Sequence, residues 1–533
     1  MVMMIPTRIY RLTTLVFATT SFALSGPHSS DGFGPSLDSA RENGPQIFNA
    51  VHNAMREFGS SLHHNGMSLF PGVIPEGVLL YHGTGSKEIP TGFEWLAFEI
   101  EHAEAFARCQ VRLPENVNGN QSPGSSAFVM HPPPPDKPWR PECPPNAGGG
   151  FLHIYQASRP LNILYIDGMA AGKTHMGTID TQDILLATNR SRALFDELGR
   201  ADGLCALARK WKIDGFIRME PGFEIIYCDF TNGLRLVSAN RRPPVEDPSE
   251  QDDLDILIFE WARAAAQRYQ GIGSSRVVLD YSSMVSGFFY PINLTNPDPE
   301  RPDLPRLVQA SEAEIDVVRE HVGDAVVRSV SSRKTPVDWQ GVTDMIVTRY
   351  AKRLPFMAQT DSIDILRNEI NGLLNIFIDY AESDEGFSAA RQRCAKFYLQ
   401  SAHGRTLEDE FIYAGVERTT TEICTALFEV RKLVLEDPDV DEGSAVEAIH
   451  QIIRDLMETL AWPEWKECGQ CQPDELCFVA MWPFGNVEDH YNPSCVNFSS
   501  VLGRSNYWQD LPPQLSMERQ LWEKDGEAGS EEL

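Results

Sequence analysis

The sequence lacks the features that mark several large classes of protein. After residue 25 no stretch approaches the roughly 18 apolar residues that a membrane-spanning helix needs, so we expect no membrane contact in the mature form. Positive charge is scarce: 46 Lys and Arg stand against 75 Asp and Glu, and the formal net charge is −29. Because such a charge repels phosphate backbones, we expect no nucleic acid partner. The sequence also contains no His-Glu-x-x-His, Gly-x-Ser-x-Gly or Cys–His protease motif, which leaves the common hydrolase classes without support.

The first 25 residues have the pattern of a secretory signal peptide. Arg8 and Arg11 precede a short apolar stretch, Leu12–Leu24, and Ala23 and Ser25 supply small residues at a cleavage site. Ten cysteines, an even number, suit the oxidising compartment to which such a peptide leads. Four sequons are candidates for glycosylation there: Asn120, Asn189, Asn293 and Asn497. The sequence therefore predicts a secreted, extracellular glycoprotein with disulfide bonds.

Changes in composition divide the chain into segments. Residues 26–45 are rich in Ser, Gly, Pro and Asp, and residues 241–253 are rich in Pro and acidic side chains. Short strands and helices alternate before the second of these segments, and helical periodicity dominates after it. The predicted order is a signal peptide (1–25), a disordered segment (26–45), a mixed domain (46–240), a linker (241–253), an α-helical domain (254–461), a Cys-rich cap (462–510) and an acidic tail (511–533).

Local patterns support the helical domain and the cap. Ser311-x-x-Glu314 and Ser444-x-x-Glu447 are capping boxes in front of apolar-periodic runs. In the cap, four cysteines have a spacing that either a zinc ion or disulfides can use: Cys468, Cys471, Cys477 and Cys495. In a secreted chain disulfides are the better interpretation, so we expect no metal. Cys109 and Cys143 flank a Pro- and Gly-rich stretch and are candidates for a further bridge.

Three short motifs in the mixed domain point to a function. The first is an apolar run, Val78–Tyr81, that ends on His82-Gly83-Thr84. The second is Trp95-Leu96-Ala97-Phe98, which a helix-like segment follows. The third is a β-branched and aromatic run, Phe223–Phe230, which predicts a strand with Glu224 at its start.

In this order the motifs resemble the NAD-binding core of ADP-ribosyltransferase-fold proteins of the His–aromatic–Glu type, such as poly-ADP-ribose polymerases and diphtheria-like toxins. In that family His-Gly-Thr or His-Gly-Ser ends the first strand, an aromatic-x-Ala element follows, and a Glu opens a later strand. The resemblance covers about residues 70–238. It implies an α+β fold with a split antiparallel sheet, which the all-α domain and the Cys-rich cap follow here. Trp95 replaces the Tyr that is more usual in the second motif.

The resemblance implies an enzyme that cleaves NAD+ and transfers ADP-ribose to an acceptor protein or to water. Glu224 is then the catalytic residue, which stabilises an oxocarbenium-like transition state. His82 is expected to bind the adenosine ribose, Gly83 and Thr84 to hold the nicotinamide side, and Trp95 to lie against the ring. Nicotinamide leaves as a neutral molecule, so no general acid is required. We expect the side chains of His82, Trp95 and Glu224 to converge in one cleft.

Two alternatives remain open. Leu161–Thr174 resembles a phosphate-binding P-loop, but Gly168 and Gly172 enclose three residues where that loop needs four, so a Gly-rich turn is the simpler interpretation. Lys173 is nevertheless placed to reach a pyrophosphate, and we include it among the cofactor-binding candidates. The second alternative is a catalytically silent binding protein on the same fold, in which His82 and Glu224 are structural residues.

Overall fold

The structure is a computed structural model that describes residues 32–107, 150–242, 259–268, 271, 276–331, 337–381, 387–402, 404–435, 442–502 and 507. The predicted signal peptide and acidic tail, most of the predicted linker, Asn120, and the pair Cys109 and Cys143 lie outside these residues. In the part of the chain that is described, no helix combines the length and the apolar character that crossing a membrane requires.

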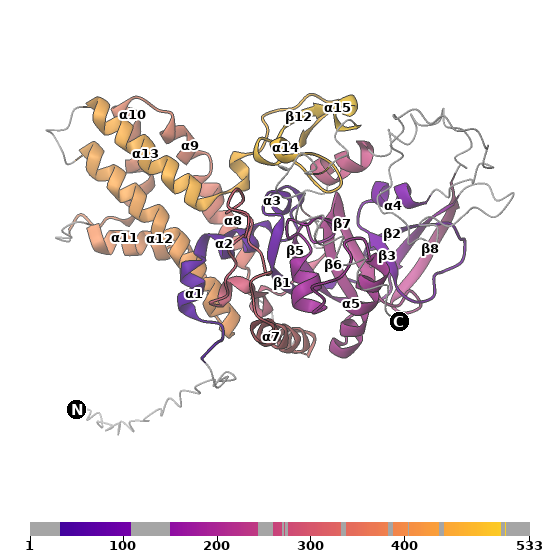
Figure 1. The fold of residues 1–533 in the computed structure, drawn as a ribbon. Coiled ribbons are helices and arrows are strands. Elements are labelled where there is room, and N and C mark those ends of the chain that lie inside the picture. Colours follow the sequence, from indigo (N-terminus) through magenta and orange to yellow (C-terminus); the bar gives the residue numbers. More distant parts are fainter. Residues whose placement is uncertain are drawn as a thin grey trace, which may run out of the picture.

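A curled sheet of ten strands forms one side of the molecule (Figure 1). Its strands are β1 (Asn65–Ile74), β2 (Leu79–Thr84), β3 (Glu94–Ala97), β4 (Phe151–Ala157), β5 (Leu161–Gly168), β6 (Gly215–Glu220), β7 (Gly222–Tyr227), β8 (Leu234–Arg241), β9 (Val278–Leu279) and β10 (Val285–Ser286). The order is β10-β1-β5-β6-β7-β3-β2-β4-β8, and β9 also pairs with β1. Neighbouring strands are antiparallel except β5 and β6, which are parallel. The fold therefore mixes helices with a large sheet, which the sequence predicted at this level.

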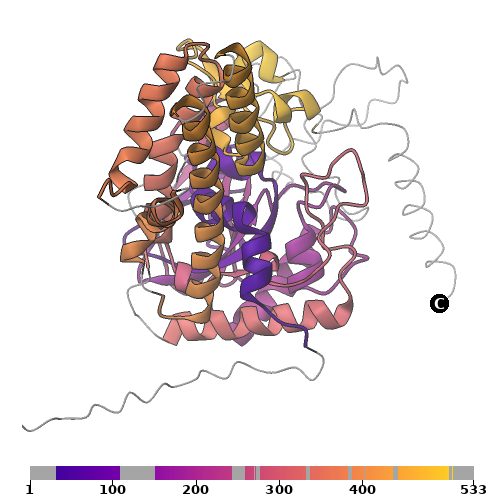
Figure 2. The ribbon, with the colours of Figure 1, turned by 90° about the vertical axis from the view of Figure 1, so that its left-hand side faces the viewer.

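Helices pack on the sheet and extend beyond it. The face of the sheet that carries the candidate functional site is covered by three of the described helices. They are α4 (Ile100–Phe106), α5 (Glu197–Trp211) and a π-helix, η1 (Thr181–Leu186). A group of helices lies beside the sheet (Figure 1). One of them, α7, runs along the bottom of the molecule in Figure 2. The members of this group are α1 (Leu37–Glu42), α2 (Gly44–Asn53), α3 (Glu57–Leu62), α7 (Glu312–Ser331), α8 (Trp339–Tyr350), α9 (Arg353–Ala358), α10 (Ile363–Leu374), α11 (Ser388–Lys396), α12 (Leu407–Leu435) and α13 (Glu442–Leu460).

The C-terminal part forms a small unit on top of the sheet in Figure 1. It consists of β11 (Glu475–Phe478), α14 (Val487–Tyr491), β12 (Ser494–Asn497) and α15 (Phe498–Leu502), and β11 pairs with β12. Two disulfides, Cys468–Cys477 and Cys471–Cys495, confirm the prediction that these cysteines form bridges. Two further disulfides, Cys205–Cys228 and Cys394–Cys424, join other described cysteines.

The N-terminal helices contradict one prediction. α1 falls inside residues 26–45, where disorder was predicted, and for this helix the prediction is wrong. Ser36 caps the helix, because its Oγ accepts a hydrogen bond from the backbone N–H of Ser39 over 3.0 Å. In α2, Ile47 packs so closely on Gly415 of α12 that a Cβ on this glycine would lie 3.0 Å from Ile47. Contacts with a helix far along the chain therefore hold a segment whose composition alone suggests disorder.

The two predicted capping boxes differ in outcome. Ser311 caps α7 as predicted, since its Oγ accepts a hydrogen bond from the backbone N–H of Glu314 over 3.3 Å and its own N–H donates to Glu314 Oε2 over 2.7 Å. α13 is already helical at Glu442, so Ser444 is not its N-cap and that prediction is wrong.

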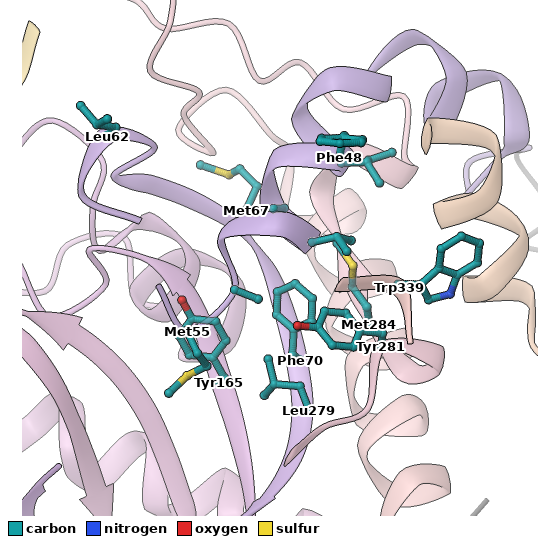
Figure 3. Close-up of a cluster of buried hydrophobic side chains, with 14 of the residues drawn as sticks. Phe48, Met55, Leu62, Met67, Phe70, Tyr165, Leu279, Tyr281, Met284 and Trp339 are labelled. Carbon is teal, nitrogen blue, oxygen red and sulfur yellow. The ribbon is translucent and has the colours of Figure 1, made fainter. Parts of the chain in front are cut away.

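One hydrophobic core joins the sheet to the helices (Figure 3). Phe70 of β1 packs against Tyr165 of β5 with 5.8 Å between ring centroids, and edge-on against Tyr281 at 5.5 Å. β9 and β10 come after the predicted linker in the chain, yet both pair with β1. The predicted linker therefore does not separate the sheet from the later part of the chain.

Candidate functional site

The structure separates the two residues that the sequence motifs were expected to bring together. Ala97 of β3 lies opposite Glu224 of β7 on one side and opposite Tyr81 of β2 on the other. Opposed residues of antiparallel strands share a face, and successive residues alternate between faces. Glu224 therefore lies on the face of Tyr81, whereas His82 lies on the other face. The expectation that His82 and Glu224 converge in one cleft is wrong, because the motifs do not fix the register of β3 between them.

His82 has a structural environment on its own face. Its Nδ1 lies 2.7 Å from the carbonyl oxygen of Trp95, and its ring lies 5.2 Å from that of Phe230 and 6.0 Å from that of His153. Burial lowers the pKa of His82 to about 4, although the hydrogen bond to Trp95 opposes the shift. A neutral imidazole that donates to a carbonyl across two strands stabilises their pairing.

The other residues of the first two motifs lie near the sheet surface. Gly83 is needed where α4 crosses β2, because a Cβ here would lie 2.1 Å from the carbonyl oxygen of Ala103. Thr84 ends β2, and its Oγ1 accepts a hydrogen bond from Ser86 N–H at 3.3 Å. The half-buried ring of Trp95 lies 6.1 Å from that of Phe93. These contacts require no ligand.

Glu224 and Lys173, in contrast, do come together, in a buried charge cluster on the face that α4 and α5 cover. The cluster consists of His102, Lys173, Glu197, Arg218, Glu220 and Glu224, each at most 6% exposed. It draws on α4, the loop after β5, the start of α5, and the strands β6 and β7. Sequence analysis found only two of these six residues.

Arg218 is the cation of the cluster that contacts Glu224. The two residues are opposed on β6 and β7, and Arg218 Nε donates to Glu224 Oε1 over 2.7 Å. Arg218 also donates to Glu197 and, over 3.3 Å, to Gln182 Oε1. Burial raises the pKa of Glu224, and the charge of Arg218 limits the rise. Burial acts likewise on Glu197, but Arg218, Lys173 and Arg200 outweigh it and hold its pKa well below the ordinary value.

Lys173 is the second cation, and it holds Glu220. Its Nζ lies 3.1 Å from Glu220 Oε2 and 3.8 Å from Glu197 Oε2. The same ammonium lies 4.5 Å from the ring centroid of Trp482, a cation–π distance. Lys173 is thus engaged by two carboxylates and an indole, which makes a P-loop role for it the weaker interpretation.

His102 completes the centre from α4. Its Nε2 lies 3.2 Å from Glu220 Oε1, and its ring stacks on Trp261 at 4.5 Å and 23°. Burial opposes a charged imidazolium, but the hydrogen bond and the charge of Glu220, together with the charges of Glu224 and Glu99, outweigh it and raise the pKa of His102.

Two further carboxylates lie at the turn between β6 and β7. Glu57 Oε1 accepts a hydrogen bond from Gly222 N–H over 2.9 Å, and burial raises its pKa well above the ordinary value. Gly222 has φ +95° and a Cβ on it would lie 2.6 Å from Glu99 Oε2, so only glycine fits this turn. Glu99 is fully buried, which raises its pKa to about 7 although the charge of His102 opposes the shift.

The surroundings of the cluster contain more carboxyl groups than permanently charged cations. Six buried carboxylates gather here (Glu57, Glu99, Asp183, Glu197, Glu220 and Glu224), against three permanently charged cations (Lys173, Arg200 and Arg218). Buried charges are stable only when they are paired or neutralised. Among the described residues, the arrangement is therefore suited to hold an additional positive charge.

The charged residues of β6 and β7 become a signal for this cluster once the burial of both strands is known. Every residue of β6 and β7 is buried, so the charged residues Arg218, Glu220 and Glu224 in these strands have no solvent-facing side available. Arg218 and Glu220 are two apart on one strand and so share a face. Charged residues at same-face positions in an otherwise apolar strand pair mark a polar centre, even where no motif is present.

The chain is similar to two proteins of Saccharomyces cerevisiae. It is 30% identical over 380 residues to the uncharacterized protein YPL277C, which covers 59% of this chain and 74% of the relative. The chain belongs to the YPL277C family. It is also 27% identical over 543 residues to the uncharacterized protein YOR389W, with 84% of this chain and 83% of the relative covered.

The family description that matches is the YPL277C N-terminal domain, over residues 36–143 and 136–249. These residues include all six members of the buried charge cluster, whereas Trp261 and Trp482, which contact it, lie beyond them. The centre thus belongs to the part of the chain that defines the family. No solved structure matches the chain.

Proposed function

We propose that the buried charge cluster is the catalytic centre of a secreted enzyme that cleaves NAD+ between nicotinamide and ribose. One observation carries the proposal: Glu220, Glu224 and His102 place one ligand atom each within 4.8 Å of one another in a site that is almost free of solvent. Cleavage of this kind passes through an oxocarbenium-like sugar cation. Fixed negative charge in a water-excluded site stabilises such a cation strongly.

The cations of the cluster fit this chemistry. Arg218 donates to Glu224 over 2.7 Å and Lys173 donates to Glu220 over 3.1 Å, so each of the two carboxyl groups has a cation bonded to one of its oxygens. Both also fix the carboxylates in place, so little reorganisation is needed when positive charge develops on the sugar. Because nicotinamide leaves as a neutral molecule, the reaction requires no general acid.

The proposal keeps one part of the resemblance to ADP-ribosyltransferase-fold proteins, the role of Glu224, and replaces the role of His82. Glu224 on β7 keeps the role that the resemblance implies, and the half-buried Trp95 shares its face of the sheet. His82 lies on the other face, so His102 and Glu220 take its place beside Glu224. We also propose that the sheet is the split antiparallel sheet of that superfamily, followed by a helical domain and a Cys-rich cap.

Substrate entry requires movement of the aromatic residues that close the cluster. Trp261 stacks on His102 and donates its Nε1–H to the carbonyl oxygen of Pro221, and Trp482 lies over Lys173. Both indoles offer flat apolar faces of the kind on which a nicotinamide or adenine ring stacks. Displacement of either indole by a substrate ring would replace one stacking contact with another.

The test is nicotinamide release from a fluorescent etheno analogue of NAD+ by the purified, secreted protein. Release with free ADP-ribose indicates hydrolysis, and release with label on an added protein indicates transfer to an acceptor. We expect release by the wild type and none by Glu224→Gln, with Glu300→Gln, an exposed position, as the matched control. A folded wild type that releases no nicotinamide under any of these conditions contradicts the proposal.

The second candidate is a catalytically silent binding protein on the same fold. The observation that favours it is that Glu197, Glu220 and Glu224 already have cationic partners, and buried ion networks also serve to specify a fold. Binding of NAD+ without release of nicotinamide, measured by calorimetry on the same samples, would favour this candidate.

A further inference from the structure

We propose that His102, Glu220 and Glu224 bind one divalent transition-metal ion. The three residues come from α4, β6 and β7, and their ligand atoms lie within 4.8 Å of one another. One imidazole nitrogen and two carboxylate oxygens, with room for water or substrate in a further position, is a recurring ligand set for Zn²⁺ in catalytic sites.

The geometry of the best-defined pair already fits an ion. His102 Nε2 and Glu220 Oε1 are 3.2 Å apart. Two ligands that each bind at about 2.0–2.1 Å in a tetrahedral arrangement are separated by about 3.3 Å. Binding at these two atoms therefore needs almost no movement of α4 relative to β6.

Lys173 and Arg218 each contact one identified oxygen of a candidate ligand carboxylate. Lys173 contacts Glu220 at Oε2, and Oε1 of that residue is the oxygen that points to His102. Arg218 contacts Glu224 at Oε1. Hydrogen bonds to the outer oxygens of ligating carboxylates are a regular part of metal sites, because they orient the inner oxygens. Lys173 and Arg218 thus occupy the places of outer-shell partners.

Glu99 supplies an independent observation. Its carboxyl group is fully buried, and among the described residues no side chain donates a hydrogen bond to it; the hydrogen bonds that lower its pKa come from the backbone at Glu99 and Phe223. It interacts electrostatically with His102, and it packs against Gly222, which lies on the turn between Glu220 and Glu224. A buried carboxyl group to which no cationic side chain is bonded is costly to ionise, and a cation at the three ligands offsets that cost.

The ligand chemistry indicates which ions fit. Imidazole together with carboxylate favours Zn²⁺, Co²⁺ or Mn²⁺, whereas Mg²⁺ and Ca²⁺ prefer oxygen ligands alone. Cys468, Cys471 and Cys495 also lie within 4.8 Å of one another, but they are bound in disulfides and hold no thiolate for an ion. The described part of the chain therefore directs a metal to the buried charge cluster rather than to the cysteines.

This inference rests on the proposed function in one respect, because the ion would regulate the same catalytic centre. The geometry of the metal site does not depend on NAD+ cleavage. A site that opposes a transient sugar cation also attracts a permanent cation, and the two compete for the same oxygens. We therefore expect a bound ion to inhibit NAD+ cleavage, and removal of the ion by a chelator to restore it.

The experiment measures metal directly, with no NAD+ present. The full secreted protein is stripped with a chelator, dialysed against Zn²⁺ and then against buffer, and its metal content is measured by mass spectrometry. We expect about one ion per chain, and a d–d absorption band from a buried site when Co²⁺ is used instead. Less than about one tenth of an ion per folded chain would overturn the proposal.

Variants locate the ion. Glu224→Gln and His102→Asn are expected to weaken Zn²⁺ binding more than about 100-fold, since loss of an outer-shell partner alone costs about 10- to 100-fold. His175→Asn and Glu300→Gln, both at exposed positions, are the matched controls and are expected to keep full occupancy. Full occupancy in both cluster variants would show that the ion binds elsewhere and would contradict the proposal. Circular dichroism verifies folding, and if one cluster variant does not fold, the other one and the Co²⁺ spectrum of the wild type still decide.

Metal binding by a protein whose chelator-stripped, metal-free form cleaves no NAD+ leaves this inference standing and contradicts the proposed function. Cleavage without metal binding does the reverse. The two failures are therefore distinguishable on the same protein.

Discussion

Arg218 and Glu224 lie opposite each other on two strands whose residues are all buried, and Arg218 Nε donates to Glu224 Oε1 over 2.7 Å. The same guanidinium also donates to Glu197 at the start of α5. One side chain therefore connects two strands and a helix through charge, and removal of it would leave two carboxylates in the core without their principal partner.

Arg218→Met tests how strongly the protein depends on this side chain. We expect the free energy of unfolding to fall by about 3–5 kcal/mol, because breaking a buried ion pair leaves uncompensated charge in the core. Arg209→Met, at an exposed position of α5, is the control and is expected to change the free energy by less than about 0.5 kcal/mol. Urea denaturation monitored by circular dichroism provides the measurement. Equal stability of the two variants would show that the buried pair contributes little.

Glu224→Gln and His82→Ala separate the two residues that the sequence motifs had joined. We expect Glu224→Gln to lower kcat for NAD+ cleavage by about 100- to 1000-fold, because the lost charge acts on the transition state. His82→Ala is expected to lower thermal stability and to leave KM unchanged, since His82 bonds to the Trp95 carbonyl on the other face. Steady-state kinetics and thermal melting decide. A stable His82→Ala with a raised KM would return His82 to the substrate site.

Gly83→Ala tests the position of α4. The added Cβ would lie 2.1 Å from the carbonyl oxygen of Ala103, so the helix that carries His102 must shift. We expect a loss of about 1–3 kcal/mol of stability from overpacking, together with weaker Zn²⁺ binding. Gly34→Ala is the control, because nothing lies within 4 Å of its added Cβ. Unchanged melting and unchanged Zn²⁺ affinity in Gly83→Ala would mean that α4 is free to move away.

The raised pKa of His52 leads us to expect that the stability of the folded protein depends on pH. It lies between Asp344 at 2.9 Å and Glu464 at 2.6 Å, with Arg56 beside it. Burial and Arg56 lower its pKa, but the hydrogen bonds to the two carboxylates outweigh them and raise it. A raised folded-state pKa stabilises the protein fully below about pH 6.5, the unfolded value, and this contribution disappears as pH rises through the folded-state value.

The measurement compares melting temperatures of the wild type and His52→Gln at about pH 6 and about pH 9. We expect the wild type to exceed the variant by more at the lower pH. Asp344 and Glu464 have lowered pKa values and stay ionised over this range, so they do not reverse the sign. A His52→Gln difference that grows with pH would contradict the assignment.

The sequence predicted the parts that local patterns determine. The apolar run ahead of His82, the aromatic element at Trp95 and the strand that begins at Glu224 are strands β2, β3 and β7. Their order along the sheet and their register are tertiary properties, and a one-residue change in register moves a side chain to the other face. For this reason the sequence predicted the three strands correctly but placed His82 and Glu224 wrongly in one cleft.

Most of the buried charge cluster could not be predicted from the sequence, for a related reason. His102, Lys173 and Glu220 come from a helix, a loop and a strand that meet only in the folded molecule. Local spacing cannot place them together, and charged residues are assigned to the surface unless both faces of their strand are known to be covered. The C-terminal disulfides were predictable, because the predicted extracellular compartment and the spacing of the cysteines both favour them.

The pairing of the first strand with late segments has a consequence for synthesis. β1 has β9 and β10 at one edge, and α2 packs on α12, which spans Leu407–Leu435. On the ribosome, Ile47 and Phe48 of α2 therefore emerge long before their partners in the fold, α12 for Ile47 and Trp462 for Phe48, have been translated. A nascent chain that presents such side chains is a substrate for chaperones until its C-terminal half has emerged. Its N-terminal segments therefore reach their final positions only after α12 has been translated.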